Sequence, residues 1–549
     1  MNYNDPTFWL LFAAVYAAYW RLTHRQQNDV LLVASYVFYG FWDYRFLFLI
    51  LISTVIDFIG GLGVAGVELP RARRVRLAAL LVGSALILCS NVHYAALWQG
   101  VAQLDAAAVV AALPRHVRDF IVPLGTAAVT FGYAAILPWL YALPERARRK
   151  TFLTISMVAN LAILGFFKYC DFFLGSLVGL LHAIGVEHVD VRLLGIILPP
   201  GISFYTFQAM SYTIDVYRGE ATPTEDLRDF ALFVCFFPHL VAGPIMRAST
   251  LLPQVIQPRH RRPGDAAEGL LLVLIGIFKK VVVADNLAPI ANMIFFQFDP
   301  GSHTMPTGPE TLIGLYAFTL QIYCDFSGYS AVARGIAKWL GFDLIINFRT
   351  PFFAVSPGDH WRRWHISLST WLRDYLYIPL GGNRRGRGAE YRNVLTTMTL
   401  GGLWHGANWT FVFWGFYHGV LLCVYRALGV KDDVEGHPVR RLLRIVLTFH
   451  LICIGFIFFR SSSFTAALHM ATRIVTNVQP TMIAVTMLGL VAFHVVPLLA
   501  LEVFTKGEER LDRILVGPWP TQAFAYAYLV LMLVVFPATQ AHEFIYFQF

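Results

Sequence analysis

The chain has 549 residues, of which 57% are hydrophobic and only 14% are charged. Soluble domains carry about 25% charged residues, so this composition excludes an ordinary water-soluble protein and predicts a polytopic membrane protein. The net charge of +9 comes from short basic clusters between apolar runs, which is typical of cytoplasmic loops and argues against a nucleic-acid-binding surface.

The N-terminal part of the chain alternates apolar segments with basic loops. The first apolar segment, residues 8–20, follows Asp5 and has no basic stretch before it. We therefore expect a first span, not a cleaved signal peptide, with its N-terminus outside the cytoplasm. Further apolar segments lie at residues 30–41, 46–64, 77–89 and 120–143, and we expect a tight outer hairpin at residues 41–45.

Beyond residue 152 the apolar segments contain charges and helix breakers. Segments at 152–167, 172–181, 193–210 and 230–245 are interrupted by Lys168, Asp171, a Pro-Pro-Gly run and Pro238. Backbone groups freed by such breaks are tolerated at membrane depth only when they are buried in protein or line a cavity. We therefore expect re-entrant or broken helices around a central cavity.

The remaining apolar segments complete an all-α membrane protein. They lie at residues 269–284, 312–340, 395–428, 442–459, 482–503 and 524–537. About eleven or more crossings follow, at roughly 20 residues for each span. No internal repeat or soluble domain stands out, so we expect residues 1–549 to form a single membrane domain.

The strongest candidate for chemistry is the sequence GGLWHGANW at residues 401–409, inside an apolar stretch. His405 lies there with Trp404 and Asn408, and the glycines leave room for a substrate. A neutral imidazole in such a place is able to take the proton of an attacking hydroxyl. The alternative is a core histidine whose nitrogens bond to a neighbouring helix.

A second candidate is the Trp- and Arg-rich segment at residues 360–386, which reads as an amphipathic interfacial helix. His365 lies within it and is expected at the cytoplasmic mouth of a cavity. Arg362, Arg363 and Arg373 are suited to the phosphates of an anionic acyl donor such as coenzyme A. The alternative is a helix anchored to anionic lipid headgroups.

Three further polar residues, in two segments, lie in apolar surroundings. Asp325 and Arg334 interrupt the stretch at residues 323–342 and are expected to pair with each other or with other buried charges. His239 lies among helix breakers at residues 236–247, where a re-entrant loop near a ligand is expected. A structural role for Asp325 and an ordinary buried histidine are the simpler alternatives.

Sequence motifs for several other kinds of catalytic and metal-binding site are missing. The motifs GxxxxGK[ST], GxSxG and HExxH are missing, and the six cysteines show no CxxC pairing. His360 and His365 are poorly spaced for a shared metal on one helix. We expect no metal and no tightly bound cofactor.

Together these segments resemble the membrane-bound O-acyltransferase superfamily. The closest branch is the bacterial one that contains the alginate O-acetyltransferase membrane subunit and the teichoic-acid D-alanine transfer protein. The resemblance is strong over about residues 199–419 and looser towards both ends. It rests on the segments at residues 199–220, 236–247, 276–289, 323–342, 361–382, 401–419 and 544–549.

The resemblance implies a fold and a site. The fold is a ring of transmembrane helices around a funnel that thins the membrane. His405 matches the near-invariant catalytic histidine, and His365 matches the second family histidine. The donor is acetyl-CoA or a carrier-protein thioester from the cytoplasm of a bacterium, and the protein lies in the inner membrane. The acceptor is a hydroxyl of a secreted polysaccharide such as alginate, cellulose or peptidoglycan, often reached through a periplasmic partner of the SGNH-hydrolase type.

Three other functions remain open from the sequence. A transporter or polymer-export channel also uses broken helices and polar groups at the midplane, although two repeated halves are missing here. A teichoic-acid D-alanyl transfer protein is less favoured, because the motifs lean to the alginate-type branch. A non-catalytic scaffold is disfavoured by the intact His405 and His365.

Overall fold

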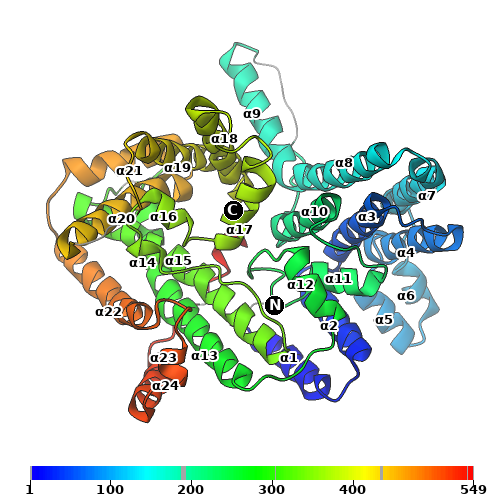
Figure 1. The fold of residues 1–549 in the computed structure, drawn as a ribbon, viewed down its shortest axis with the longest axis horizontal. Coiled ribbons are helices and arrows are strands. Elements are labelled where there is room, and N and C mark those ends of the chain that lie inside the picture. Colours follow the sequence, from blue (N-terminus) through cyan, green and yellow to red (C-terminus); the bar gives the residue numbers. More distant parts are fainter. Residues whose placement is uncertain (1–2, 187–192, 303, 433–436, 541, 548–549) are drawn as a thin grey trace.

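The computed structural model describes residues 3–186, 193–302, 304–432, 437–540 and 542–547. Every regular element within these ranges is a helix, which confirms the prediction of an all-α protein. The helices form a ring in projection, and the last described segment of the chain, drawn in red, lies near its middle (Figure 1).

The N-terminal helices occupy one side of the ring in Figure 1. Asp5 caps the first helix, because its side chain accepts a hydrogen bond from the Thr7 N–H. Pro6 is the first residue of this helix, a position that favours proline. The elements are α1 Pro6–Tyr19, α2 His24–Gly40, η1 Tyr44–Phe46, α3 Leu47–Ala65, α4 Arg71–Cys89, α5 Tyr94–Ala102, α6 Ala106–Ala111, η2 Val117–Phe120, α7 Ile121–Tyr141, α8 Glu145–Leu164, η3 Gly165–Tyr169 and α9 Cys170–Ala183.

The middle of the chain holds one long helix and many short ones. The elements are α10 Ile202–Arg218, α11 Leu227–Cys235, α12 Ala248–Ile256, α13 Asp265–Ile277, η4 Phe278–Ala284, α14 Asp285–Phe296, α15 Gly308–Trp339, η5 Pro351–Phe353, α16 Pro357–Trp361, α17 Ile366–Leu372 and η6 Arg373–Tyr377. Short, interrupted helices in this region agree with the helix breakers in its sequence.

The C-terminal helices complete the ring on the opposite side from α3 and α8 (Figure 1). The elements are α18 Arg387–His405, α19 Trp409–Ala427, α20 Pro438–Arg460, α21 Phe464–Thr476, α22 Met482–Thr505, α23 Asp512–Leu515, α24 Trp519–Val535 and η7 Ile545–Phe547.

Five helices of the described residues are long and apolar enough to cross a membrane. A sixth crossing arises if α4 and α5, bent by 81°, form one broken span. The expected total of eleven or more crossings stays a prediction, because the other apolar segments are shorter or interrupted. The five are Tyr44–Ala65, Val117–Tyr141, Glu145–Ala183, Pro438–Arg460 and Met482–Thr505.

Helix α15 is almost completely buried and packs closely against α13. Gly276 of α13 faces Gly328 of α15, and a methyl group added at Gly276 would lie 2.6 Å from the Gly328 carbonyl oxygen. Gly269 and Gly335 form a second close contact of this kind, each seven residues away from the first pair. Small residues let helix backbones approach closely, which is the usual way that helices associate in lipid.

One of the predicted broken segments lies inside the protein. The chain after α11 continues without a regular helix through residues 236–247, and these residues are buried except Arg247, which is half-buried. The segment at 193–210 becomes helical only at Ile202, after Gly201 adopts a left-handed conformation with φ 72°. Its non-helical residues 193–198 are exposed or half-buried, so irregular backbone is buried in protein at 236–247 but not there.

Two sequence interpretations are wrong in detail, and both differences shape the site. Residues 395–428 are not one span but two antiparallel helices, α18 and α19, with the chain reversing at residues 406–408. Residues 360–386 are not one helix, because His365 adopts a left-handed conformation between α16 and α17. Tertiary packing overrides the apolar continuity from which each single helix was predicted.

Candidate active site

His405 is the last residue of α18, at the tip of the α18–α19 hairpin. The Asn408 side chain accepts the Thr410 N–H at 3.1 Å and caps the start of α19. Gly402 and Gly415 face each other across the hairpin, so the two backbones approach closely. The hairpin therefore fixes the His405 imidazole where one helix ends and the other begins.

Aromatic rings surround the His405 imidazole, which is only 4% exposed. Ring centres of Trp404, Trp414, Phe459 and Tyr546 lie 5.0–5.7 Å from it. Among the described residues, the His405 Nδ1 has no hydrogen-bond partner. Several other buried side-chain atoms share this lack of a partner, so the unbonded nitrogen is compatible with a catalytic role but does not by itself indicate one.

His365 lies beside His405, with 6.4 Å between the two ring centres. Its φ of 42° is unusual for a residue other than glycine. The Asn347 Oδ1 lies 3.2 Å from the His365 Nδ1 and accepts the Ser367 N–H at 3.1 Å. Burial lowers the pKa of His365 to about 3, so its ring is neutral over the physiological range.

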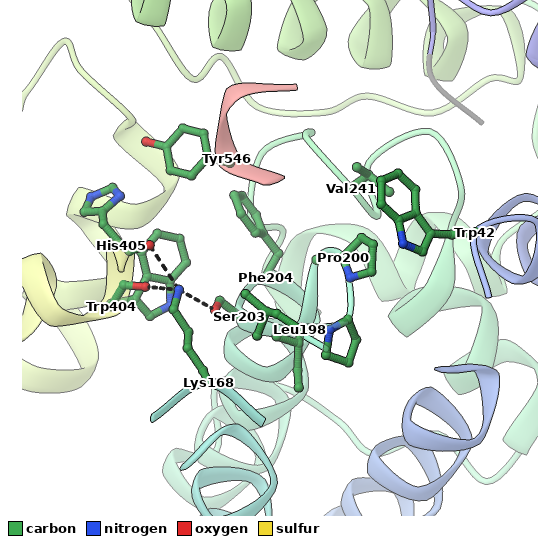
Figure 2. A pocket seen from close by; sticks show the side chains of 13 residues that line it. Trp42, Lys168, Leu198, Pro200, Ser203, Phe204, Val241, Trp404, His405 and Tyr546 are labelled. Carbon is green, nitrogen blue, oxygen red and sulfur yellow. Dashed lines mark hydrogen bonds between the residues drawn. The ribbon is translucent and has the colours of Figure 1, made fainter. Parts of the chain in front are cut away.

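Lys168, from η3, forms hydrogen bonds with the C-terminal end of α18. Its Nζ donates to the carbonyl oxygens of Trp404 at 2.6 Å and His405 at 3.1 Å, and to the Ser203 Oγ at 3.3 Å (Figure 2). The Tyr169 hydroxyl donates to the Leu403 carbonyl at 3.1 Å. These donors satisfy carbonyls that a helix end leaves unpaired, and a cation there complements the helix dipole.

His405 is among the residues that line two cavities. Cavity A has about 560 Å³ of empty space and is lined by His405, Lys168 and Tyr546 among others. Figure 2 shows Tyr546, Phe204 and the segment around Pro200 grouped around it. Cavity B has about 770 Å³ and is lined by His405, Trp414 and residues of α17 and α18. His405 therefore lies in the walls of both cavities.

Two of the three arginines predicted to bind the donor do not line these cavities. Arg363 contacts Asp359 at 2.8 Å, and Arg362 contacts Asp432 at 2.6 Å. The third, Arg373, lines cavity B together with Arg426, which the sequence did not single out.

The other predicted residues take several places. Trp404 lines cavity A and packs at 5.4 Å from the ring centre of Phe207. Asn408 caps α19 and lines a third cavity beyond the hairpin tip. His239 is buried, and its Nε2 lies 2.8 Å from the Gln208 Oε1, which supports the alternative of an ordinary buried histidine.

The contacts of Asp325 give it a structural role. It contacts the Lys280 Nζ at 2.7 Å and accepts the Ile545 N–H at 2.7 Å. It therefore ties the C-terminal segment to α15. Arg334 pairs with Glu508 and not with Asp325.

Sequence reasoning missed three residues that shape the site. Asn347 lies between motifs, Lys168 was recorded only as an interruption of an apolar segment, and Tyr546 was noted only as part of a terminal motif. A lysine inside an apolar run was the one indication available, because such a charge is expensive in a membrane.

Comparisons with known proteins identify the family of this chain. The model of the membrane-bound O-acyltransferase family matches residues 224–429, which include both histidines. A probable alginate O-acetylase of Azotobacter vinelandii is 38% identical over 473 residues, covering 86% of this chain and 77% of the relative. The chain belongs to the membrane-bound O-acyltransferase family. It is therefore an O-acyltransferase and a multi-pass membrane protein.

Two further relatives of this O-acyltransferase carry similar names. A probable alginate O-acetylase of Pseudomonas aeruginosa is 37% identical, with 86% of this chain and 74% of the relative covered. A peptidoglycan O-acetyltransferase of Helicobacter pylori is 36% identical over 372 residues, covering 63% of this chain and 68% of the relative.

Proposed function

We propose that this O-acyltransferase moves an acetyl group from a cytoplasmic thioester, acetyl-CoA or a carrier protein, towards hydroxyls of a secreted polysaccharide. The observation that supports it most is that His405 lines two separate cavities. The names of the relatives, which are alginate and peptidoglycan acetylases, support a polysaccharide as the final acceptor.

The distribution of arginine supports entry of the donor through cavity B. Helices α18 and α20 begin beside basic clusters at residues 384–387 and 440–444, and such clusters stay in the cytoplasm. Arg426, which lines cavity B, contacts Glu390 in the first turn of α18 at 2.8 Å. Cavity B thus extends from His405 towards the basic end, where Arg373 and Arg426 suit a donor phosphate.

The acceptor is expected to enter from the side opposite the donor, through cavity A. Cavity A is lined by Trp42, from the hairpin that the charge pattern assigns to the outer face. On this topology the N-terminus is periplasmic and the protein lies in the bacterial inner membrane. A periplasmic partner of the SGNH-hydrolase type would complete the transfer to the polymer.

The chemical step uses His405 as general base. Its free ring nitrogen takes the proton of the acceptor hydroxyl while the oxygen attacks the thioester carbonyl. The C–S bond then breaks, and the proton passes to the leaving thiolate. Aromatic walls keep water from the thioester, and His365 holds a neutral ring beside the reacting groups. A covalent acyl-His405 relay is a variant of this step.

The test replaces His405 with Ala in purified protein in nanodiscs. We expect acetyl transfer to fall by about 100-fold or more, as for loss of a general base, while the amount inserted and the thermal midpoint stay unchanged. His182→Ala, at an exposed position on α9, is the matched control and keeps full activity. Retained transfer in His405→Ala removes this residue from the mechanism, and thioester use by the wild type separates an enzyme from a channel.

A further inference from the structure

A large cavity lies at the end of α4 that is opposite the basic start of this helix at residues 71–76. It has about 1120 Å³ of empty space, and it is lined by η1, the α4–α5 connection and the segment that leads from α6 into η2. We call it the outer cavity, because the proposed topology puts this end of α4 at the outer face of the membrane. Neither His405 nor His365 lines it, so the outer cavity is separate from the proposed reaction.

Basic side chains dominate the polar lining of the outer cavity. They are Arg45, His93, Arg115, His116 and Arg118. Arg45 forms an ion pair with Asp43 at 2.6 Å. Among the residues that the structure describes, the guanidinium groups of Arg115 and Arg118 form neither an ion pair nor a hydrogen bond, and both side chains are exposed. Their N–H donors are therefore available to a ligand.

The carboxylate in this lining is already engaged. Asp119 accepts the Asn91 side-chain amide at 3.0 Å. It also accepts the backbone N–H groups of His116 at 3.0 Å and Arg115 at 3.2 Å. The guanidinium groups of Arg115 and Arg118 are thus left for an external anion, and the planar guanidinium matches the oxygens of a phosphate. The lining therefore suits a ligand that carries a phosphate.

The helices beside the outer cavity are suited to the surface of a bilayer. Helix α5 is bent by 81° from α4, so it lies nearly parallel to a membrane that α4 crosses. Trp98 on α5 is 74% exposed, and Leu104 after its end is 92% exposed. Figure 1 shows α5 and α6 at the edge of the ring beside α4. Apolar side chains on a helix in the plane of the membrane enter the headgroup region, where tryptophan is enriched.

The α5–α6 hairpin is held against the cavity by its backbone. A methyl group at Gly100 would lie 2.9 Å from the Val109 nitrogen, so α5 and α6 pack closely. Asp105 caps α6, and the His93 N–H donates to the Ala112 carbonyl at 3.0 Å. The exposed apolar side chains and the basic lining are therefore kept next to each other.

We propose that the outer cavity binds the headgroup of an anionic phospholipid, with Arg115 and Arg118 holding the phosphate and the acyl chains lying against α5. The proposal goes beyond the proposed function, since it concerns how the protein meets the membrane and no step of acetyl transfer. A headgroup that carries its own ammonium is less suited, because the two guanidinium groups repel it. Phosphatidylglycerol carries hydroxyls in place of the ammonium and keeps a net negative charge.

The test titrates the purified full-length protein in detergent with radiolabelled dioctanoyl phosphatidylglycerol. We expect saturable binding that the double change Arg115→Gln/Arg118→Gln weakens about tenfold or more, as for loss of charged hydrogen bonds. The control Arg71→Gln/Arg76→Gln makes the same charge change at the other end of α4 and keeps this affinity. All four arginines are exposed, so the thermal midpoint without lipid stays unchanged in both variants. Equal affinity in the two variants overturns the proposal.

Competing ligands show which part of the lipid is recognised. We expect dioctanoyl phosphatidylcholine to bind about tenfold more weakly than phosphatidylglycerol. Inorganic phosphate should displace the label only at about 100-fold higher concentration, because it lacks acyl chains. Displacement by phosphate at the same concentration as the lipid assigns the site to a free anion and overturns the lipid headgroup. Equal affinity for the two lipids overturns the preference for an anionic one.

Discussion

The two histidines of the site differ in how they are held. His405 has aromatic neighbours and an unbonded Nδ1, whereas His365 is oriented by Asn347. The Ser367 N–H is able only to donate, so the oxygen of the Asn347 amide must face it, and the His365 Nδ1 must carry the proton. The His365 Nε2 is then a neutral acceptor in the site.

The first prediction concerns this orientation. Asn347→Ala removes the oxygen that holds the His365 ring, whose left-handed backbone is itself unfavourable by about 1–3 kcal/mol. We expect kcat to fall about 10- to 100-fold, since an unpaired buried polar group costs about 1–3 kcal/mol, with little change in KM. Steady-state kinetics with acetyl-CoA measures this split.

A neighbouring change is the matched control for Asn347→Ala. Ser367→Ala removes a hydroxyl that donates to the same Asn347 oxygen at 3.0 Å and lies 3.4 Å from the His365 Nδ1, but it leaves the closer Asn347–His365 contact at 3.2 Å in place. We expect no more than a few-fold loss of kcat. Equal effects of the two substitutions would show that Asn347 acts through general stability and not through the imidazole.

At the scale of elements, the α18–α19 hairpin decides where the chemistry takes place. A methyl group at Gly402 would collide with the Phe411 carbonyl oxygen and lie 3.0 Å from the Gly415 Cα. No other residue type fits there without separating the helices, because both obstacles are backbone atoms. The reversal of the chain, and with it the position of His405, depends on these glycines.

The second prediction follows from that packing. Gly402→Ala should lower the stability of the protein by about 1–3 kcal/mol through overpacking, which thermal unfolding in detergent measures. Gly388→Ala, on the same helix with open space around its Cα, should leave the thermal midpoint unchanged or raise it slightly. A normal midpoint and full activity in Gly402→Ala would mean that the two helices do not approach as closely as described.

At the scale of the whole molecule, the chain end returns to the site. The Ile545 N–H donates to Asp325, a residue 220 positions earlier, and Lys280 bridges Asp325 and Asp285 at 2.7 and 2.8 Å. This buried network places Tyr546 in the wall of cavity A, with its ring centre 5.7 Å from that of His405. Cavity A is thus lined both by Tyr546, near the C-terminal end, and by Trp42, near the N-terminal end.

The third prediction tests this closure. Asp325→Ala leaves the Lys280 charge with one fewer partner and frees the Ile545 N–H, and breaking a buried ion pair costs about 3–5 kcal/mol. We expect faster proteolysis of a C-terminal tag and a loss of acetyl transfer. Asp512→Ala, which removes an exposed pair with Arg510, is the control and should change neither. An unchanged proteolysis rate in Asp325→Ala would contradict the anchoring role.

The sequence alone determined the membrane class, the all-α fold and the family, because composition and motifs are local properties of the chain. It also singled out His405 and His365, since each lies within a recognisable motif. The catalytic role of either residue remains a prediction. Helix existence was easier to predict than helix ends, so two joined apolar helices were read as one span at residues 395–428.

Only the tertiary structure decided what surrounds those histidines. Lys168 reaches the carbonyl of His405 across 237 positions of sequence. Of the three arginines predicted for the donor, the fold brings only Arg373 to cavity B, and it adds Arg426. Hydrophobic periodicity reports which face of a helix is buried but not which distant segment covers it. Contacts between remote segments, and the cavities between them, arise only when the helices pack.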